Sequence, residues 1–218
     1  MRSDAGGGWG ATASRDDRGP RRGPAPGRQL TAEPVPTHRR RGCHHLRLPP
    51  EPAPAVLFLC TGNAARSVMA GAVLGALAPS VAVETAGTLT VEGQPVSFRT
   101  RAALGAIGLK PGSHRSRQAT ASDLQRATLV IGLAPEHVAW VRREHPAAAG
   151  RTATLRRLER DLPAGGPLAE RVAGLGLAGL ELEAWEEVVD PGGGEVEEFT
   201  AAAIEIDRLV RSLAPRLG

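Results

Sequence analysis

Short apolar runs alternate with segments of helical periodicity along most of the chain. Four apolar, β-prone runs predict strands, at residues 56–59, 81–83, 128–131 and, more weakly, 151–155. Four segments repeat an apolar residue every three or four positions and predict helices, at residues 68–77, 98–109, 136–144 and 196–213. This alternation predicts an α/β fold of three layers, a doubly wound parallel four-stranded sheet with helices on both faces. Such sheets bind ligands outside the carboxyl ends of their strands.

The C-terminal half contains one clear helix and one ambiguous segment. The apolar positions of the last helix are Phe199, Ile204, Ile206, Leu209, Val210 and Leu213. Residues 156–189 are ambiguous, because helical stretches are broken by the Pro- and Gly-rich residues 163–167. Within that segment, the Glu-rich residues 181–187 are interpreted as a solvated helix face.

Residues 1–54 show no sustained apolar periodicity. They hold nine of the 18 prolines and eight of the 27 glycines, with ten of the 27 basic residues against five of the 23 acidic ones. Such a segment buries too little apolar surface to compensate for its ordering entropy. The sequence therefore predicts a disordered, basic, Gly/Pro/Arg-rich tail over residues 1–54 and a folded domain over residues 55–218. The Arg39-Arg40-Arg41 cluster is interpreted as solvated, and nucleic acid is not expected as a partner.

The composition limits the cellular locations that are expected for the protein. No window approaches 18 consecutive apolar residues, so no membrane span is expected. No apolar stretch follows the charges near residue 1, so no secretory signal is expected. Two cysteines cannot form a disulfide scaffold, and a reducing, cytoplasmic location is predicted. The sequence gives no indication of the oligomeric state.

The segment that follows the first strand carries the candidate chemistry. It reads Cys60-Thr61-Gly62-Asn63-Ala64-Ala65-Arg66-Ser67. A loop of this length can curl around a tetrahedral oxyanion with its N–H groups inward, and the helix that follows adds its positive end. Gly62 and Asn63 tolerate the left-handed backbone that such a curl needs. Arg66 can bind two phosphoryl oxygens, the same positive field favours the thiolate of Cys60, and Ser67 can donate a hydrogen bond to that sulfur. The residues expected to bind phosphate are Thr61, Gly62, Asn63, Ala64, Ala65 and Arg66.

Four motifs together resemble the low-molecular-weight protein tyrosine phosphatases over about residues 55–213. In chain order, they are Val56 to Ser67 with Met69-Ala70, Glu84 to Thr88, His114 to Gln118, and Val189-Asp190-Pro191. Their order and spacing also agree with the family. The resemblance implies a cysteine-dependent phosphomonoester hydrolase, a protein tyrosine phosphatase, whose substrate is a phosphorylated protein or a small phosphomonoester.

The resemblance also implies a role for each residue of the site. Cys60 would attack phosphorus and form a thiophosphate intermediate, while Arg66 and the loop amides hold the equatorial oxygens. Ser67 would stabilise the departing thiolate. Asp190 would protonate the leaving oxygen and then activate water, as a poor leaving group requires.

Around this loop, supporting contacts are implied as well. Asn63 would fix the shape of the loop through hydrogen bonds to Thr85 and His114 or their neighbours. No metal and no cofactor are implied, and the histidines beside Cys43 are interpreted as incidental.

Two departures from the family pattern concern redox protection and substrate. Ala65 replaces the second cysteine that often precedes the loop arginine, so a protective disulfide with Cys60 is not expected. Gly192 replaces the aromatic residue that usually follows Asp-Pro, and the chain contains no tyrosine. A wall for a phosphotyrosine ring is therefore missing there, unless Trp140 or Trp185 takes its place.

Two alternative functions stay open at this point. An arsenate reductase that uses an external low-molecular-weight thiol needs only Cys60 and Arg66, whereas a version with intramolecular disulfides needs cysteines after residue 60, and none occurs. A non-catalytic phosphate-binding module is the second alternative, because the Gly-rich residues 191–194 could leave Asp190 poorly positioned.

Overall fold

A four-stranded parallel sheet forms the centre of the folded domain. The computed structural model describes residues 19, 23 and 54–217. Its strands follow the order β2-β1-β3-β4. They are β1 (Ala55–Cys60), β2 (Ala82–Gly87), β3 (Leu129–Gly132) and β4 (Thr152–Thr154). All four predicted strands are present, and the predicted α/β class is confirmed.

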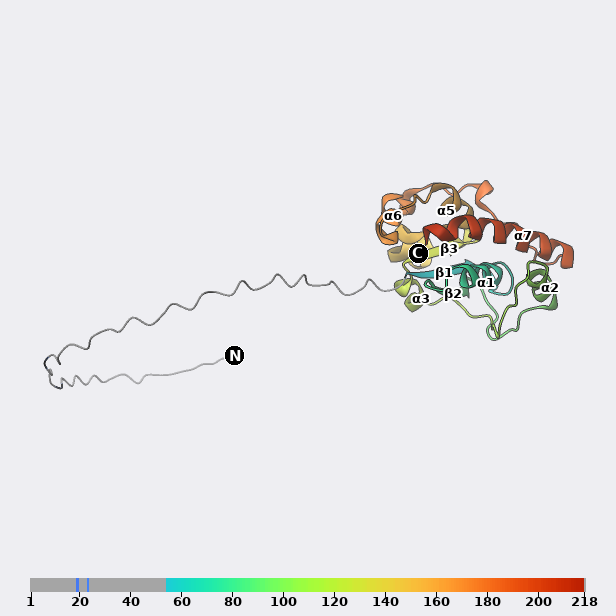
Figure 1. Cartoon of the computed structure of the whole chain (residues 1–218), viewed down its shortest axis with the longest axis horizontal. Coiled ribbons are helices and arrows are strands. Elements are labelled where there is room, and N and C mark those ends of the chain that lie inside the picture. Colours follow the sequence, from blue (N-terminus) through green and yellow to red (C-terminus); the bar gives the residue numbers. More distant parts are fainter. Residues whose placement is uncertain (1–18, 20–22, 24–53, 218) are drawn as a thin grey trace, which may run out of the picture. The chain divides into compact units, whose positions relative to one another are not determined.

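Helices connect and cover these strands (Figure 1). The α-helices are α1 (Arg66–Leu77), α2 (Phe98–Ala106), α3 (Ala121–Arg126), α4 (Pro135–Glu144), α5 (Leu155–Asp161), α6 (Leu168–Gly174) and α7 (Val196–Leu213). The 3-10 turns are η1 (Pro146–Arg151), η2 (Leu177–Gly179), η3 (Ala184–Glu186) and η4 (Ala214–Arg216). The ambiguous residues 156–189 thus form most of α5, with α6, η2 and η3. The second helix ends earlier than predicted, because Gly108 has a φ of 77° and takes the backbone out of the helix.

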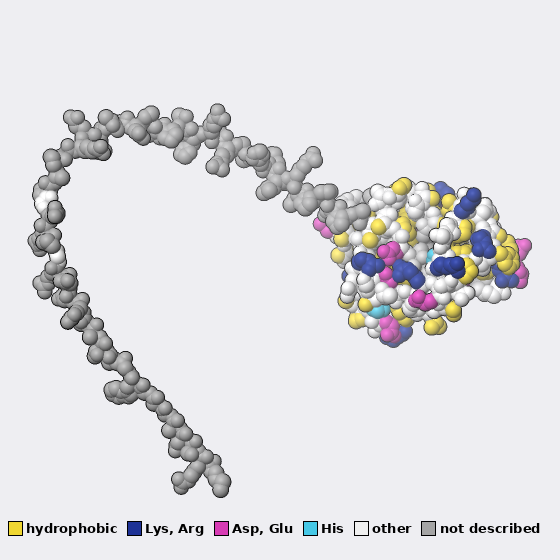
Figure 2. All heavy atoms as spheres, turned by 90° about the horizontal axis from the view of Figure 1, so that it is seen from below, with side chains coloured by type: hydrophobic (Ala, Val, Ile, Leu, Met, Phe, Trp, Pro, Cys, Tyr) yellow, Lys and Arg dark blue, Asp and Glu magenta, His cyan; other side chains and the backbone are white. Residues whose placement is uncertain are grey.

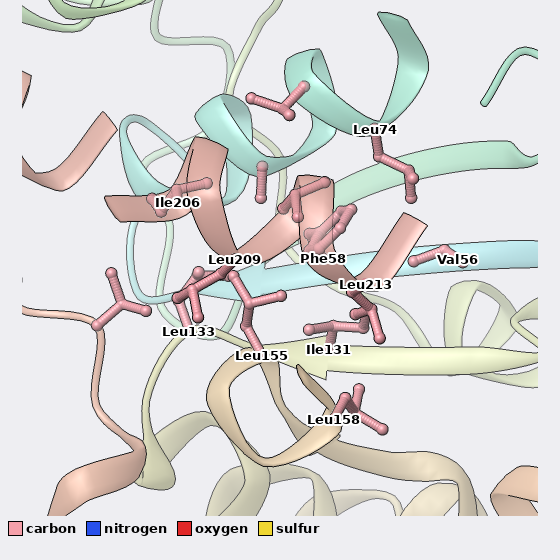
Figure 3. Packing of buried hydrophobic residues seen from close by; sticks show 14 of the residues in the cluster. Val56, Phe58, Leu74, Ile131, Leu133, Leu155, Leu158, Ile206, Leu209 and Leu213 are labelled. Carbon is pink, nitrogen blue, oxygen red and sulfur yellow. The ribbon is translucent and has the colours of Figure 1, made fainter. Parts of the chain in front are cut away.

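One face of the sheet packs against α1 and α7. Val56, Phe58 and Ile131 point from the strands into a cluster with side chains of α1, α5 and α7 (Figure 3). Helix α7 contributes buried apolar residues three or four positions apart: Phe199, Ala202, Ala203, Ile206, Leu209, Val210 and Leu213. Ile204 was predicted to share this stripe, but it is 57% exposed because it lies off the buried face of α7.

The opposite face packs against α3, α4 and η1. The alternate residues of β1, Leu57 and Leu59, join Val130 of β3 in a second buried cluster with Leu124 of α3 and Val141 of α4. Because β1 is covered on both sides, its residues form a continuous apolar run rather than an alternating one. The predicted covering of both faces by helices is confirmed.

Charges are interspersed on the folded domain. Figure 2 shows basic and acidic side chains side by side on one face, without a field of one sign. Within the described residues, no helix is both long and apolar enough to span a membrane. The tail predicted for residues 1–54 lies outside the described residues, apart from residues 19, 23 and 54.

Candidate active site

The loop between β1 and α1 lies at the carboxyl end of the central strand. Cys60 is the last residue of β1 and is 3% exposed as a free thiol. Its Sγ lies 3.0 Å from the Oγ of Ser67, in the first turn of α1. No side chain caps the start of α1 at Ala65, so the positive end of this helix faces the loop. The arrangement places the sulfur of Cys60 beside a helix terminus that can bind an anion.

Asn63 connects the loop to the segments around it. It is fully buried and has a φ of 49°, a left-handed conformation that asparagine tolerates. Its Nδ2 donates to Ser67 Oγ and to Thr85 Oγ1, both at 3.0 Å. Its Oδ1 accepts from the backbone N–H of Arg117 at 3.0 Å, and its carbonyl oxygen lies 2.8 Å from His114 Nε2. The residues expected to support the loop therefore meet around Asn63.

The turn after β2 packs directly against the same loop. The carbonyl oxygen of Thr61 accepts from the backbone N–H of Leu89 at 3.0 Å and from Thr90 Oγ1 at 3.3 Å. A Cβ on Gly87 would lie 1.9 Å from Thr90 Oγ1 and 2.5 Å from the Thr61 oxygen. Position 87 therefore needs glycine for this close approach of two backbone segments.

Arg66 joins the loop to the segment that carries Asp190. Its guanidinium is 2% exposed and donates from NH1 to the carbonyl oxygen of Val188 at 3.1 Å. From NH2 it donates to Asp190 Oδ2 at 2.5 Å. The Val188 N–H in turn donates to the carbonyl oxygen of Leu133, beyond the end of β3, at 2.9 Å. The predicted acid thus lies beside the predicted phosphate clamp, although 124 residues separate the two.

These groups enclose a pocket of about 260 Å³. It is lined by Cys60, Gly62, Ala64, Ala65, Arg66, Ser97, Thr100, Asp190, Gly192 and Phe199. Thr100 also donates from Oγ1 to the carbonyl oxygen of Ala64 at 3.0 Å. Ser97 and Thr100 are not among the residues predicted from the sequence. Ser97 is the N-cap of α2, and its side chain accepts a hydrogen bond from the Thr100 N–H. The sequence signal for this cap was a serine at the start of the predicted helix, three residues before Thr100.

Phe199 supplies the aromatic side chain of the pocket. It lies on α7 and was predicted only as a core position of that helix. Gly192 also lines the pocket, so the wall lacks a ring at that position. Neither proposed substitute lines it. Trp140 packs against the cluster on the α4 face, and the ring centroid of Trp185 lies 4.1 Å from the guanidinium carbon of Arg160.

His137 is a buried polar residue beneath the loop that the sequence analysis missed. It is fully buried in the first turn of α4, and its Nε2 lies 3.1 Å from Thr61 Oγ1. Its Nδ1 has no hydrogen-bond partner. Burial and the charge of Arg66 lower the pKa of His137 to about 3, so the imidazole is neutral at physiological pH.

Because of this lowered pKa, His137 should make the fold sensitive to acid. The unfolded chain binds a proton at His137 below about pH 6.5, whereas the folded state binds it only near pH 3. Stability from His137 is therefore present above pH 6.5 and lost as the pH falls toward 3. Between pH 7 and pH 5 the loss is about 2 kcal/mol. Urea unfolding at both pH values should show a smaller loss for His137→Asn than for the parent, and equal losses would contradict the shift.

A buried ion pair anchors the segment that leads to Asp190. Glu186 is fully buried and accepts from Arg157 NH2 at 2.5 Å and from Thr154 Oγ1 at 2.6 Å. Burial alone would raise the pKa of Glu186, but these hydrogen bonds outweigh it and hold the pKa below its usual range. The interpretation of residues 181–187 as solvated holds for Glu181, Glu183 and Glu187, which are exposed, but not for Glu186. Glu186 fixes the chain two residues before Val188, which Arg66 contacts.

Comparisons with known sequences give a consistent result. The family model described as low molecular weight phosphotyrosine protein phosphatase matches residues 55–162. A protein-arginine-phosphatase of Geobacillus stearothermophilus is 29% identical over 163 residues, covering 74% of this chain and 95% of that protein. A probable low molecular weight protein-tyrosine-phosphatase, EpsP of Ralstonia solanacearum, is 30% identical over 105 residues, covering 48% of this chain and 72% of that protein.

Solved structures agree with these matches. The YwlE arginine phosphatase from Geobacillus stearothermophilus has a TM-score of 0.60 at 29% identity, covering 75% of this chain and 92% of that one. A low molecular weight protein tyrosine phosphatase from T. tengcongensis has a TM-score of 0.59 at 27% identity, with coverages of 73% and 97%. These relatives are phosphatases, which favours hydrolysis over arsenate reduction and over non-catalytic phosphate binding.

Proposed function

Because the chain belongs to the low molecular weight phosphotyrosine protein phosphatase family and is therefore a cysteine-dependent phosphatase, we propose that Cys60 is its nucleophile. The thiolate attacks phosphorus, the bond from phosphorus to the leaving oxygen breaks, and a sulfur–phosphorus bond forms. The observation that carries the proposal is the meeting of Cys60, Arg66 and Asp190 in one pocket of about 260 Å³.

The remaining groups have complementary roles in this proposal. Asp190 donates a proton to the leaving oxygen in the first step and takes one from the attacking water in the second. That water releases inorganic phosphate and returns the electron pair to sulfur. Ser67, at 3.0 Å from Sγ, stabilises the returning thiolate. Arg66 and the N–H groups of residues 61–66 hold the phosphoryl oxygens throughout.

A reducing compartment suits this chemistry, because an oxidised Cys60 could not attack phosphorus. Cys60 is a free thiol, and Ala65 offers no second sulfur within the loop. We therefore propose a cytoplasmic location.

For the substrate, we propose phosphotyrosine in a protein. Phe199 lines the pocket and offers an aromatic surface to a phenyl ring, although Gly192 does not. A second candidate is phosphoarginine in a protein. It is favoured by the match to a protein-arginine-phosphatase, which extends over 163 residues, whereas the match to EpsP covers 105.

A side-by-side comparison of initial rates tests this substrate assignment. We expect kcat/KM for a phosphotyrosine peptide to exceed that for a sugar phosphate by about fivefold or more, since a ring contact alone contributes about 1 kcal/mol. A phosphoarginine peptide of the same sequence separates the two candidates. Faster hydrolysis of the phosphoarginine peptide would reverse the assignment, and arsenate-dependent thiol oxidation without phosphate release would overturn the phosphatase itself.

A further inference from the structure

A second cavity, of about 440 Å³, adjoins the active-site pocket. The two cavities share Asp190 and Gly192. One side of the second cavity is formed by the segment 189–194. The other side is one face of α7, with residues at helical spacing: Glu198, Ala201, Ala202 and Glu205. A groove therefore runs from the phosphate site along α7, and we call it the α7 groove.

The walls of the α7 groove are small and apolar. Val189 is 67% exposed beside it, and Pro191 lies two residues further along the same segment. Ala201 and Ala202 face them from α7. These apolar surfaces suit a methylene chain, which gains from apolar contact without needing a hydrogen-bond partner.

Charge gives the α7 groove a preference for cations. Three carboxylates line it and no basic side chain does. Two of these already have cationic partners, since Asp190 pairs with Arg66 and Glu205 with Arg156. In the described part of the chain, Glu198 forms no ion pair and only accepts a backbone N–H at its helix start. Glu198 thus leaves a net negative charge at the groove.

We propose that the α7 groove binds a lysine or arginine side chain that is adjacent in sequence to the phosphorylated residue of the substrate. The methylene stem lies along the apolar walls and the cationic end meets Glu198. A bare metal ion does not suit the groove, because hard cations need six or more oxygen ligands. The inference rests on the proposed function, since the occupant is a side chain of a substrate whose phosphate lies in the active-site pocket.

The test compares phosphopeptides that differ in one residue beside the phosphorylated position. Lysine, norleucine or glutamate is placed there, on either side in separate series, and each rate is expressed relative to p-nitrophenyl phosphate. The parent should favour the lysine peptide over the norleucine peptide about tenfold in kcat/KM in one series, and the glutamate peptide should be the slowest. In Glu198→Gln this preference should fall to about one. It should also shrink in the parent between about 0.05 M and about 0.5 M salt.

Glu197→Gln is the matched control, because Glu197 is exposed in the same turn of α7 but does not line the groove. It should keep the full lysine preference. Filling the groove with Ala201→Leu, at an exposed helix position, should slow all three peptides relative to p-nitrophenyl phosphate. A lysine preference that survives Glu198→Gln, or peptide rates unaffected by Ala201→Leu, would overturn the inference. These outcomes can be distinguished from failure of the proposed phosphatase function, because in that case the parent would hydrolyse neither the peptides nor p-nitrophenyl phosphate.

Discussion

Hydrolysis of p-nitrophenyl phosphate should fall by on the order of 10⁴-fold or more when Cys60 is replaced by serine. The hydroxyl of serine would occupy the place of the sulfur, but it is a weak nucleophile without a general base to take its proton. The neighbour within reach is the Ser67 hydroxyl, at 3.0 Å from Sγ, and it is not a base. Steady-state release of p-nitrophenolate measures the loss.

Binding should survive in Cys60→Ser, because backbone N–H groups and Arg66 form the anion site. Added phosphate or vanadate should therefore raise the Tm of the variant as it raises that of the parent. Cys43→Ser is the control for a thiol-to-hydroxyl change elsewhere in the chain, and it should keep the parent rate. A Cys60→Ser enzyme as fast as the parent would remove Cys60 from the nucleophile role.

Replacement of Asp190 by asparagine should slow phenyl phosphate by about 10² to 10³-fold and p-nitrophenyl phosphate by about tenfold or less. Phenolate is a poor leaving group that needs a proton, whereas p-nitrophenolate leaves almost unaided. An asparagine oxygen can still accept the Gly192 N–H, as Asp190 Oδ1 does at 3.0 Å, whereas its Nδ2 cannot accept from Arg66 as Asp190 Oδ2 does. A series of aryl phosphates with graded leaving groups measures the difference as a slope.

Glu187→Gln is the matched control for this experiment. Glu187 is an exposed carboxylate three residues before Asp190, and it does not line the active-site pocket. Its variant should show the leaving-group dependence of the parent. Equal slowing of all aryl phosphates by Asp190→Asn would mean that Asp190 acts on binding rather than on proton transfer.

Local patterns predicted the parts of the fold that bury one continuous apolar surface. The run from Val56 to Leu59 fills both faces of the central strand, and α7 carries its apolar stripe over five turns. Short polar elements were not predicted, because they bury too few apolar side chains to produce a periodic pattern in the sequence. Helix α3 has one buried apolar side chain, Leu124, and is marked chiefly by its capping box, Thr120 with Asp123.

For the candidate active site, the sequence predicts most where the chemistry is contiguous. Cys60 to Ser67 form one loop, so their types and spacing carry the argument. Three other residues reach this loop only because their helices pack beside it: Phe199 on α7, Thr100 on α2 and His137 on α4. A local sequence pattern does not predict which face of a helix will contact which loop. His137 gave the weakest signal, since a histidine at a helix start is usually exposed.

The ion pair between Arg66 and Asp190 has a consequence for the rate of product departure. The guanidinium N–H groups that hold the carboxylate are the ones that a phosphate would need. We expect an arriving substrate to displace the carboxylate from Arg66, which frees Asp190 to face the leaving oxygen. When inorganic phosphate is the occupant, the same carboxylate competes for the guanidinium and hastens its escape. Asp190 would thus act as an exchangeable anion within the site, which keeps the phosphate-binding loop from being blocked by the product.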